Sequence, residues 1–402
     1  MRKVLAVALG KLSRYLLRLV RRGGGSALPG LIAATLYPPL LSEAMRSMPQ
    51  GVIGVSGSAG KSSTTHQLVK LLQAHGLRVF TNPSTANIRQ GLFAAILKVC
   101  SPAGKLDYDI AVLELDEGHG AALAKDLGIR VVVLTNVLSD QLDRFVDPEL
   151  VSEKLAEIAK ASKEIIVNVD DKNLTQFAHQ HQSVFGFRLA NQLSEAKDSP
   201  RYALNFGPHP AIDSQVEVDY KDGFRVVFDD QEYSLTVDSA ELALNYAAAL
   251  LASSRVVKLD PSLVRALFSS SEGVFARNEK AVIRDRAVNL RLVQNPTSFQ
   301  LNLDEISGTE KPLMLMAGRD IHDPSWLWTV DFTKLKRVDV VSGFNAYELA
   351  LRLKVAGVQI GLIEPDIARS TEEFFKLDGL DATILFSADA MRRFRRYTKV
   401  AK

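Results

Sequence analysis

Short apolar runs alternate with helical patterns along the chain from about residue 50 onward. The run Val52–Ser56 is followed by a helical pattern at Lys61–His75, and this order repeats as far as the apolar run Glu164–Val169. The segments between them are Arg78–Asn82, Asn87–Cys100, Asp109–Leu115, Gly120–Leu127, Val131–Asn136 and Pro148–Ala161. Strands that alternate with helices predict an α/β fold, in which helices cover both faces of a parallel sheet.

The pattern changes in the second half of the chain. From about Val184 to Leu235 short mixed stretches are separated by turn residues, which predicts a small β insertion. Helical periodicity returns at Ala240–Ser253 and Pro261–Phe268, and a second α/β pattern runs from about Val274 to the end. With a linker at Ser269–Gly273, we expect a lead-in at residues 1–50, a central domain at 51–270 that contains the insertion at about 184–235, and a C-terminal Rossmann-like α/β domain at 274–402.

Composition and charge narrow the class of protein. The 402 residues are 47% apolar and 24% charged, which is typical of a globular protein with two or three domains. Cys100 is the only cysteine, so the chain can form no internal disulfide and no zinc site built from several thiolates. A reducing cytoplasmic location fits this count. The 49 basic and 46 acidic residues leave a net charge of +3, which gives no sign of a nucleic-acid partner.

The first residues of the chain form a basic segment. Apolar residues at helical spacing predict an amphipathic helix at residues 2–22. This segment has no acid and seven basic residues, namely Arg2, Lys3, Lys11, Arg14, Arg18, Arg21 and Arg22. It could lie on an anionic membrane surface, or it could pack on its own domain with the basic side chains in water. The charge-free run Gly23–Ser42 contains three prolines and is not expected to span a membrane.

A glycine-rich segment lies between the first apolar run and the first helical pattern. It reads GVSGSAGKSS, Gly54–Ser63. In a phosphate-binding loop, backbone N–H groups and a helix N-terminus surround the phosphates, a lysine reaches the terminal phosphates and a serine can hold Mg²⁺. Five residues rather than the common four separate Gly54 from Gly60. We interpret the segment as a nucleotide-binding loop, with an incidental glycine turn as the alternative.

Polar residues follow several of the predicted strands. Glu114 ends the run Asp109–Leu115, Asn136 ends Val131–Asn136, and Asn168 lies near the end of the next run. Ligands collect at the carboxyl ends of parallel strands, so Glu114 is a candidate for binding the Mg²⁺ that accompanies ATP. Each residue alone is more often part of a solvated turn or a helix cap. Together they predict one edge that holds nucleotide and metal.

The order of these motifs resembles the Mur ligases, ATP-dependent enzymes that activate a carboxylate as an acyl phosphate during peptidoglycan assembly. Further segments are similar to MurT, the subfamily of ligase subunits of lipid II isoglutaminyl synthase. These segments are Gly10–Gly30, DQLDRF (Asp140–Phe145), VFARNE (Val274–Glu279), QNPTSF (Gln294–Phe299), GRDIHDPSWLW (Gly318–Trp328) and Ser342–Gly357. The resemblance implies a central P-loop ATPase domain followed by a MurT-type C-terminal domain.

The resemblance also implies a reaction and a partner. ATP would phosphorylate the α-carboxylate of D-glutamate in lipid II, and ammonia from a GatD-type glutaminase subunit would convert it to D-isoglutamine. Ser62 and Glu114 would bind Mg²⁺, and Asp320 or Asp323 would be the acid that serves the glutaminase. The residues expected to contact the nucleotide are Gly57, Ser58, Gly60, Lys61, Ser62, Ser63, Asn136, Asn168 and Arg277. The enzyme would act in the cytoplasm, at the inner membrane face if residues 2–22 bind lipid.

Several positions depart from the family pattern. MurT proteins commonly carry a four-cysteine zinc ribbon in the central domain, but the stretch Val184–Leu235 has no cysteine, so zinc is not expected. Substitutions relative to the family occur at Ala59, Ser139, Leu242 and Gln294. They motivate a second hypothesis, a noncatalytic nucleotide-binding scaffold for the glutaminase. A third is an amino-acid-adding ligase of the Mur or folylpolyglutamate type.

Overall fold

The computed structural model of the chain describes residues 2–20, 27–82, 88–137, 148–190, 211–237, 240–269, 279–293, 299–300, 302–303, 306, 312–321, 324–379 and 381–400. The chain divides into two compact units. Unit 1 comprises Met1–Leu138 with Asp147–Ser271, and unit 2 contains Glu272–Lys402. Of the predicted linker, Ser269 alone lies among the described residues.

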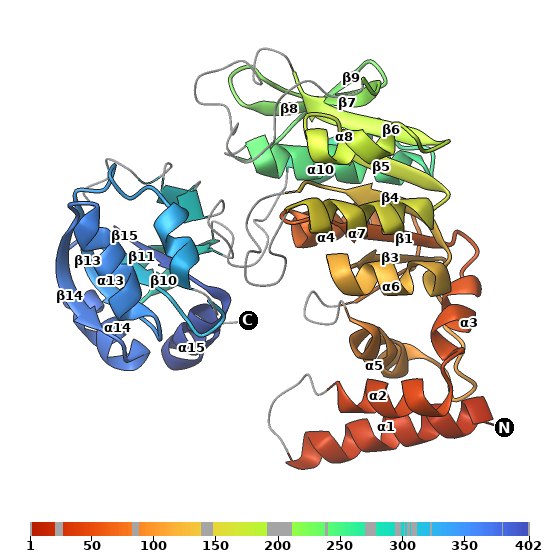
Figure 1. The fold of residues 1–402 in the computed structure, drawn as a ribbon, viewed down its shortest axis with the longest axis horizontal. Helices are drawn as coiled ribbons and strands as arrows, with labels where there is room; N and C mark the ends of the chain where they lie inside the picture. Colours follow the sequence, from red (N-terminus) through yellow and green to blue (C-terminus); the bar gives the residue numbers. More distant parts are fainter. Residues whose placement is uncertain are drawn as a thin grey trace. The chain divides into compact units, whose positions relative to one another are not determined.

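A nine-stranded sheet forms the framework of unit 1 (Figure 1). Its strands lie in the order β2, β3, β1, β4, β5, β6, β7, β8, β9. Neighbours from β2 to β7 pair in parallel, whereas β8 and β9 are antiparallel. The bounds are β1 Val52–Ser56, β2 Val79–Thr81, β3 Ile110–Glu114, β4 Ile129–Leu134, β5 Glu164–Asn168, β6 Val184–Leu189, β7 Ser214–Tyr220, β8 Phe224–Phe228 and β9 Gln231–Ser234.

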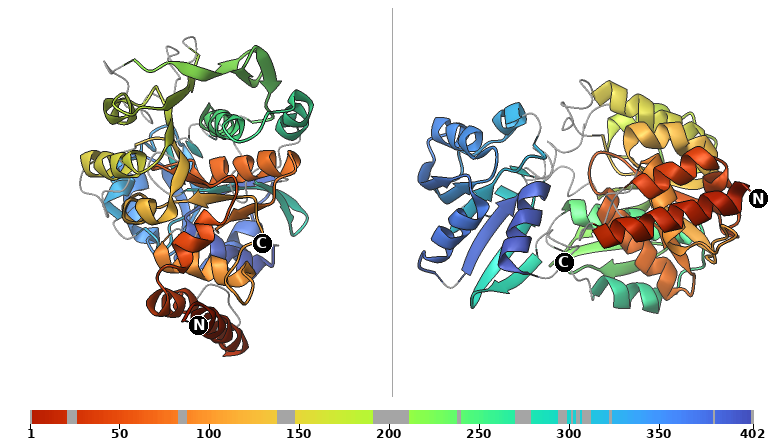
Figure 2. Two further views of the ribbon diagram at one scale, coloured as in Figure 1. Left: turned by 90° about the vertical axis from the view of Figure 1, so that its right-hand side faces the viewer. Right: turned by 90° about the horizontal axis from the view of Figure 1, so that it is seen from below.

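Helices cover both faces of this sheet, as the alternating pattern predicts (Figure 2). One face carries α4 (Lys61–Ala74), α10 (Ala240–Ser254) and α11 (Pro261–Ser269). The other carries α6 (Glu117–Leu127), α7 (Pro148–Lys160) and α8 (Lys172–Ala178). The central strands β1 and β3 are buried along their whole length, since both of their faces are covered.

The stretch predicted as a small β insertion forms the strands β6 to β9, which continue the central sheet. Strand β6 pairs in parallel with β5, and β7 pairs in parallel with β6. Burial alternates along β7, and Val216 and Val218 join the core beneath α10. Because only every second residue is buried, the sequence of such a strand lacks the continuous apolar run that marks a strand buried on both faces. The mixed pattern therefore predicted β structure in this stretch but not its pairing with the central sheet.

The lead-in consists of three helices that belong to unit 1. They are α1 (Arg2–Val20), α2 (Leu28–Leu36) and α3 (Leu40–Arg46). Helices α1 and α2 lie side by side at one end of the unit and contact each other and α5 (Arg89–Val99) (Figures 1 and 2). In the part of the chain that the structure describes, no helix is long and apolar enough to cross a membrane.

Unit 2 is a second α/β fold. Its six-stranded sheet has the order β10, β11, β15, β12, β13, β14, with β10 antiparallel and the others parallel. One core contains Leu349 of α13, and the opposite core contains Phe374 of α14 and Phe394 of α15. The bounds are β10 Glu279–Ile283, β11 Arg286–Leu292, β12 Leu313–Met316, β13 Arg337–Ser342, β14 Gln359–Glu364, β15 Asp381–Phe386, α13 Ala346–Val355, α14 Ile367–Phe375 and α15 Ala388–Thr398.

Candidate active site

The glycine-rich loop connects the central strand β1 to the N-terminus of α4, as predicted. Gly57 and Gly60 have φ values of +126° and +84°, a region that side chains rarely adopt. A Cβ atom on Gly57 would lie 2.3 Å from Thr135 Oγ1, and one on Gly60 would lie 2.3 Å from Asn245 Oδ1. Both glycines are therefore required by the backbone conformation and by close packing against residues from other elements.

Two residues that follow β4 hold this loop in place. Asn136 Oδ1 accepts a hydrogen bond from Ala59 N at 2.8 Å, and Asn136 Nδ2 donates to Ala59 O at 3.2 Å. Thr135 Oγ1 also donates to Ala59 O, at 2.6 Å, and Ser58 N donates to Asn136 O at 2.9 Å. The N–H groups of Ser58 and Ala59 are thus bonded to Asn136. The N–H groups in the first turn of α4 have no acceptor within the helix, and they are therefore the groups that can bind phosphate.

Lys61 is the first residue of α4, and its ammonium group lies inside the loop. Its Nζ is 2.6 Å from Glu117 Oε1 and 3.2 Å from Ser58 O, and it also donates to Gly57 O. Glu117 is the first residue of α6 and is 1% exposed. Burial of this carboxylate is tolerated because the Lys61 cation neutralises it. The sequence showed Glu117 only as an acid close to Glu114 and did not predict its pairing with Lys61.

Glu114 ends β3 beside β1, and its carboxylate meets the start of α4. Ser62 Oγ donates a hydrogen bond to Glu114 Oε2 at 2.8 Å. Asn82, just past the end of β2, brackets the Glu114 backbone: Glu114 N donates to Asn82 Oδ1, and Asn82 Nδ2 donates to Glu114 O, each at 3.0 Å. Asn82 was not predicted, although it ends a predicted strand in the same way as Glu114.

The end of β5 forms a tight turn. Asn168 is buried, and its Oδ1 accepts from Asp170 N at 3.1 Å. Asp171 is also buried; it caps α8 and accepts from Val137 N at 2.6 Å. Burial raises the pKa of Asp171 to about 6, although hydrogen bonds from backbone N–H groups oppose the shift. In this structure Asn168 supports the turn, and a contact with nucleotide stays a prediction.

Helix α10, which lies beside α4 on the same face of the sheet, supports the loop as well. Asn245 Oδ1 accepts a hydrogen bond from Thr64 Oγ1 at 3.2 Å and lies against Gly60. One turn further along α4, Gln67 Nε2 donates to Tyr246 Oη at 2.9 Å. The α4 N-terminus is therefore fixed by residues from β4 and α10 as well as by its own strand.

The structure thus brings most of the predicted nucleotide and metal residues to one edge of the unit 1 sheet. Ser62 contacts Glu114, the neighbouring Lys61 contacts Glu117, and Asn136 shapes the loop beside them. Arg277 and Asp323 lie outside the described residues, as do the substituted positions Ser139 and Gln294. Asp320 belongs to unit 2, where its Oδ1 accepts from Ser387 Oγ at 2.6 Å.

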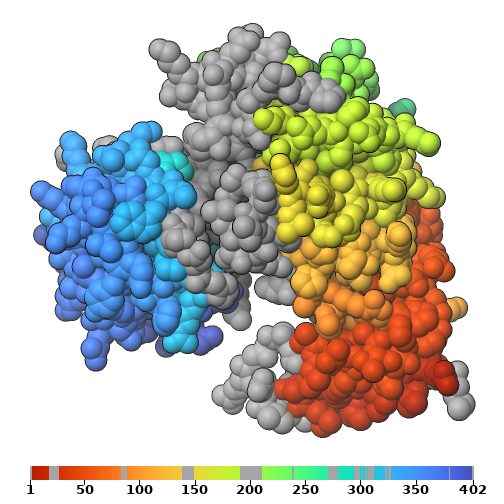
Figure 3. Space-filling view, viewed as in Figure 1, coloured from red at the N-terminus to blue at the C-terminus, as the bar shows by residue number. Residues whose placement is uncertain are grey.

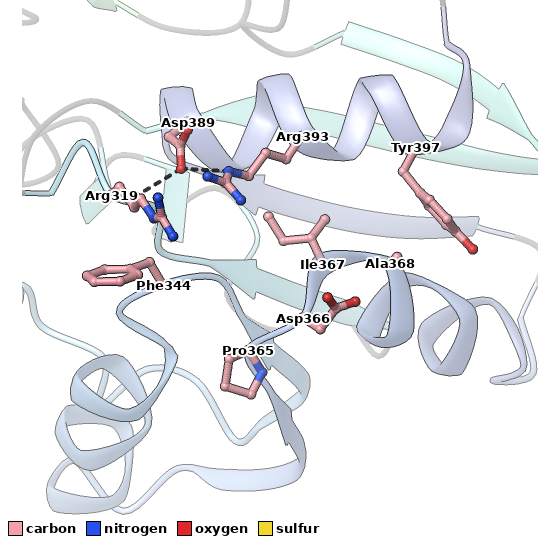
Figure 4. Close-up of a pocket in the computed structure, with 9 residues that line it drawn as sticks. All are labelled: Arg319, Phe344, Pro365, Asp366, Ile367, Ala368, Asp389, Arg393 and Tyr397. Atoms are coloured by element: carbon pink, nitrogen blue, oxygen red, sulfur yellow. Dashed lines mark hydrogen bonds and ion pairs between the residues drawn. The ribbon is translucent and has the colours of Figure 1, made fainter.

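Unit 2 has a polar cavity of about 460 Å³ at the carboxyl edge of its own parallel strands (Figure 4). Its lining residues follow β12, β13, β14 and β15, and they include Arg319, Phe344, Asp366, Asp389 and Arg393. Asp389 Oδ2 accepts from Arg393 Nε at 3.1 Å and from Arg319 N at 3.3 Å. The Arg319 guanidinium lies 5.1 Å from the Phe344 ring centroid. The cavity occupies the edge where open α/β sheets bind ligands.

The residues at the unit 1 edge fit a magnesium ion bound together with a nucleotide. Magnesium prefers oxygen ligands, and in nucleotide sites it keeps several waters and uses one or two protein groups plus phosphates. Ser62 Oγ and Glu114 Oε2 form such an oxygen pair beside the loop. Across the described ranges there is no cluster of three or more His, Cys, Asp or Glu that could bind a metal without a nucleotide.

Comparisons with known proteins agree with this architecture. The Mur ligase middle domain family matches residues 55–207, and the MurT ligase C-terminal family matches residues 292–391. The chain is 24% identical to the lipid II isoglutaminyl synthase subunit MurT of Staphylococcus aureus (strain COL), over 96% of this chain and 95% of that protein. It is 25% identical to the subunit of the same name from Streptococcus pneumoniae, over 98% and 96% of the two chains.

Solved structures show the same fold. MurF ligase from Thermotoga maritima, in complex with ADP, has a TM-score of 0.65 at 19% identity and covers 94% of this chain and 88% of its own. A bifunctional folylpolyglutamate synthase from Yersinia pestis, complexed with AMPPNP and a Mn ion, has a TM-score of 0.64 at 16% identity. The match covers 90% of this chain and 92% of that one.

The fold, the loop and these matches indicate an ATP-dependent ligase built on a P-loop. The chain carries a match to the Mur ligase middle domain and another to the MurT ligase C-terminal domain, and it is similar to MurT subunits over nearly its whole length.

Proposed function

We propose that this chain is the ligase subunit of an enzyme that amidates the α-carboxylate of D-glutamate in lipid II, giving D-isoglutamine. One observation carries the proposal: at the end of the central strands Ser62 contacts Glu114 and the neighbouring Lys61 contacts Glu117, in a chain similar to MurT subunits along nearly its whole length. The curated relatives are named as subunits of a glutamine-hydrolysing lipid II isoglutaminyl synthase.

The reaction has two steps, a phosphorylation and an amidation. In the first, an oxygen of the substrate carboxylate attacks the γ-phosphorus of ATP, the bond to ADP breaks, and an acyl phosphate forms. In the second, the lone pair of ammonia attacks the acyl carbon, phosphate leaves, and the nitrogen loses a proton to give the amide. Phosphorylation is needed because an ionised carboxylate is a poor electrophile and has no adequate leaving group.

Residues of unit 1 supply the electrostatics of the first step. The N–H groups in the first turn of α4 bind phosphate oxygens, and the Lys61 ammonium offsets the charge that accumulates when two anions approach each other. Ser62 Oγ and the Glu114 carboxylate would hold Mg²⁺, which would lower the net charge of the triphosphate. Asn136 keeps the loop in the conformation that presents the α4 N-terminus to the nucleotide.

A second subunit supplies the nitrogen in this proposal. A GatD-type glutaminase would release ammonia from glutamine, and Asp320 or Asp323 of unit 2 would serve that reaction. The hydrogen bond from Ser387 Oγ orients the Asp320 carboxylate at the edge of the unit 2 sheet. The substrate carries a lipid anchor, so the reaction takes place at the cytoplasmic face of the membrane.

The test is an amidation assay read by mass spectrometry. The full chain, with and without its glutaminase partner, is incubated with lipid II, ATP and either glutamine or ammonium. We expect the mass change for replacement of a hydroxyl by an amino group, obtained with ammonium by the chain alone and lost in Lys61→Ala. Lys70→Ala, on the same helix, is the matched control.

The other outcomes favour the two alternatives. A stable complex that leaves the mass of lipid II unchanged would replace the proposal with a noncatalytic nucleotide-binding scaffold. ATP turnover that a free amino acid stimulates, with a mass increase equal to one residue, would instead indicate an amino-acid-adding ligase.

A further inference from the structure

Helices α1 and α2 turn their small residues inward and their leucines outward. Gly10 of α1 and Gly30 of α2 both lie against α5: a Cβ on Gly10 would be 2.6 Å from Leu97 Cδ1, and one on Gly30 would be 1.9 Å from Gln90 O. Ala6 and Val7 of α1 are also buried. The two helices therefore form one layer on α5, and their opposite faces point away from the body of unit 1.

The outward faces are apolar, and we call them the leucine face. On α1 it comprises Leu5, Leu9, Leu12 and Leu16, whose spacing of four, three and four residues puts them on one side of the helix. Leu5, Leu12 and Leu16 are 51–55% exposed. Leu28 and Leu31 of α2, each 46% exposed, extend it. Single exposed leucines are ordinary, but a contiguous set on adjacent helices marks an interaction surface.

The charge of the segment that carries this face identifies what it contacts. Residues 1–42 contain seven Lys or Arg and no Asp or Glu. On α1, Lys3 lies beside Glu43 at 2.9 Å and Lys11 donates to Cys100 O, so these cations border the face that packs on the protein. The side of the helix bearing Leu5, Leu9, Leu12 and Leu16 carries no acidic residue. A helix whose charged residues are all basic and whose opposite face is apolar has the pattern of a helix that lies in the interface of an anionic bilayer.

A second copy of the chain fits this face less well. A symmetric contact would bring the same patch of each copy together, and with it two segments that each carry seven basic residues, of which Lys3 is paired with Glu43. A bilayer rich in anionic headgroups supplies both the apolar phase and the opposite charge.

We propose that α1 and α2 are a peripheral membrane-docking surface, which inserts the leucine face among the acyl chains of anionic phospholipid. This inference goes beyond the proposed reaction and does not depend on it, because binding to a bilayer needs no nucleotide and no active site. For a substrate that carries a lipid anchor, such docking would raise the local concentration of substrate at the enzyme.

The test measures partition of the full chain onto vesicles. One set contains phosphatidylglycerol with phosphatidylcholine, and the other contains phosphatidylcholine alone. The variant Leu5→Glu/Leu12→Glu puts two charges on the leucine face. The matched control Leu351→Glu/Val355→Glu puts two charges on exposed positions of α13, where the side chains are 55% and 61% exposed.

We expect the wild type to bind the anionic vesicles at least about tenfold more tightly than the neutral ones, the leucine-face variant to lose at least about tenfold, and the control to match the wild type. A labelled cysteine provides a second readout that introduces no charge. Cys100 is buried, so Leu12→Cys can be modified selectively with a polarity-sensitive dye. Its emission should shift to the blue on anionic vesicles, whereas dye on Leu351→Cys should not respond.

Three results would overturn the proposal. The first is no binding to anionic vesicles at low salt, and the second is equal binding by the leucine-face variant. The third is a wild-type dimer that becomes monomeric in Leu5→Glu/Leu12→Glu without any response to lipid, which would identify the face as a contact between copies. Amidation of a soluble stem-peptide analogue separates this proposal from the reaction, because the leucine-face variant should retain it.

Discussion

The Lys61 ammonium lies 2.6 Å from the Glu117 carboxylate, and together they join the N-terminus of α4 to that of α6. Both side chains are largely buried, 14% and 1% exposed, so the pair is not a surface ion pair weakened by solvent. Lys61 is also the residue proposed to neutralise the terminal phosphates. A nucleotide that enters the loop must therefore compete with Glu117 for the same cation.

This competition predicts that Glu117→Gln strengthens nucleotide binding. The amide keeps the shape of the side chain but removes a negative charge close to the phosphates, so the Kd for ADP should fall by about threefold to tenfold. Lys61→Ala should raise that Kd by at least about tenfold. Isothermal titration calorimetry measures both.

Glu43→Gln is the matched control for this prediction. Glu43 lies on α3 and pairs with Lys3 of α1, away from the glycine-rich loop in the sequence. Its replacement also removes one paired carboxylate, but it should leave the Kd for ADP unchanged. Weaker binding by Glu117→Gln would show that Glu117 positions Lys61 for the phosphates rather than competing with them.

The Ser62–Glu114 contact predicts a loss of magnesium-dependent turnover. Ser62→Ala removes the hydroxyl, and Glu114→Gln removes the charge while retaining a side chain of the same size at a buried strand end. Each should reduce ATP hydrolysis by at least about a hundredfold if the pair holds the ion that accompanies the triphosphate. Steady-state phosphate release at several Mg²⁺ concentrations measures this.

The melting temperature of both variants is measured as well, and it should fall by no more than a few degrees because the fold is retained. Lys70→Ala, further along α4 and outside the predicted nucleotide contacts, serves as the control on the same helix. Turnover close to wild type in Glu114→Gln would remove Glu114 from the metal site.

The β1–loop–α4 unit and the strand-end residues could be predicted from sequence because each depends on local order. A continuous apolar run, a glycine loop and a helical pattern follow one another directly, and the carboxyl ends of parallel strands meet at one edge whatever their order in the sheet. Glu114 and Asn136 were found in this way. Asn82 obeys the same rule, but its strand is only three residues long, Val79–Thr81, and was a weak signal.

The remaining features depend on contacts between distant residues. Lys61 and Glu117 are 56 positions apart, and nothing local to either shows that they pair. Periodicity showed that residues 2–22 form an amphipathic helix but not which side packs. The side that packs is the one with the small residues, because Gly10 and Gly30 allow their helices to approach α5 closely whereas leucines would not. Packing on the domain and exposure of the leucines therefore occur together.

The loop contacts of Asn136 predict a variant that loses nucleotide affinity with little loss of fold. Asn136→Ala removes both side-chain hydrogen bonds to Ala59, so the loop should populate other conformations and the apparent Kd should rise by the cost of ordering it again, about tenfold. Asn136→Asp keeps the acceptor for Ala59 N but places a charge beside the phosphates, and should bind ADP more weakly than Asn136→Ala. Equal affinities in the two variants would argue against phosphates near this side chain.

Asp171 predicts a specific pH dependence of stability in unit 1. Its pKa is raised from 3.8 to about 6, chiefly by burial, with the Asp170 charge adding to the shift and N–H groups of Val137, Asn173 and Leu174 opposing it. The folded state therefore binds a proton more tightly than the unfolded state. The stabilisation from this proton is fully present below pH 3.8 and is lost as the pH rises through about 6. Between pH 7 and pH 5 the free energy of unfolding should gain about 1 kcal/mol from this group alone.

Comparison with Asp171→Asn isolates that contribution, because other titrating groups are common to both proteins. Hydrogen exchange of the amides in β1, β4 and β5 reports the opening of unit 1 without a contribution from unit 2. The variant should be less stable at both pH values, since an amide cannot accept all the N–H groups that the carboxylate accepts. The deficit should widen as the pH falls from 7 to 5. An unchanged deficit would mean that Asp171 ionises at its ordinary pKa, and a deficit that narrows would mean that its pKa lies below that value because its hydrogen bonds outweigh its burial.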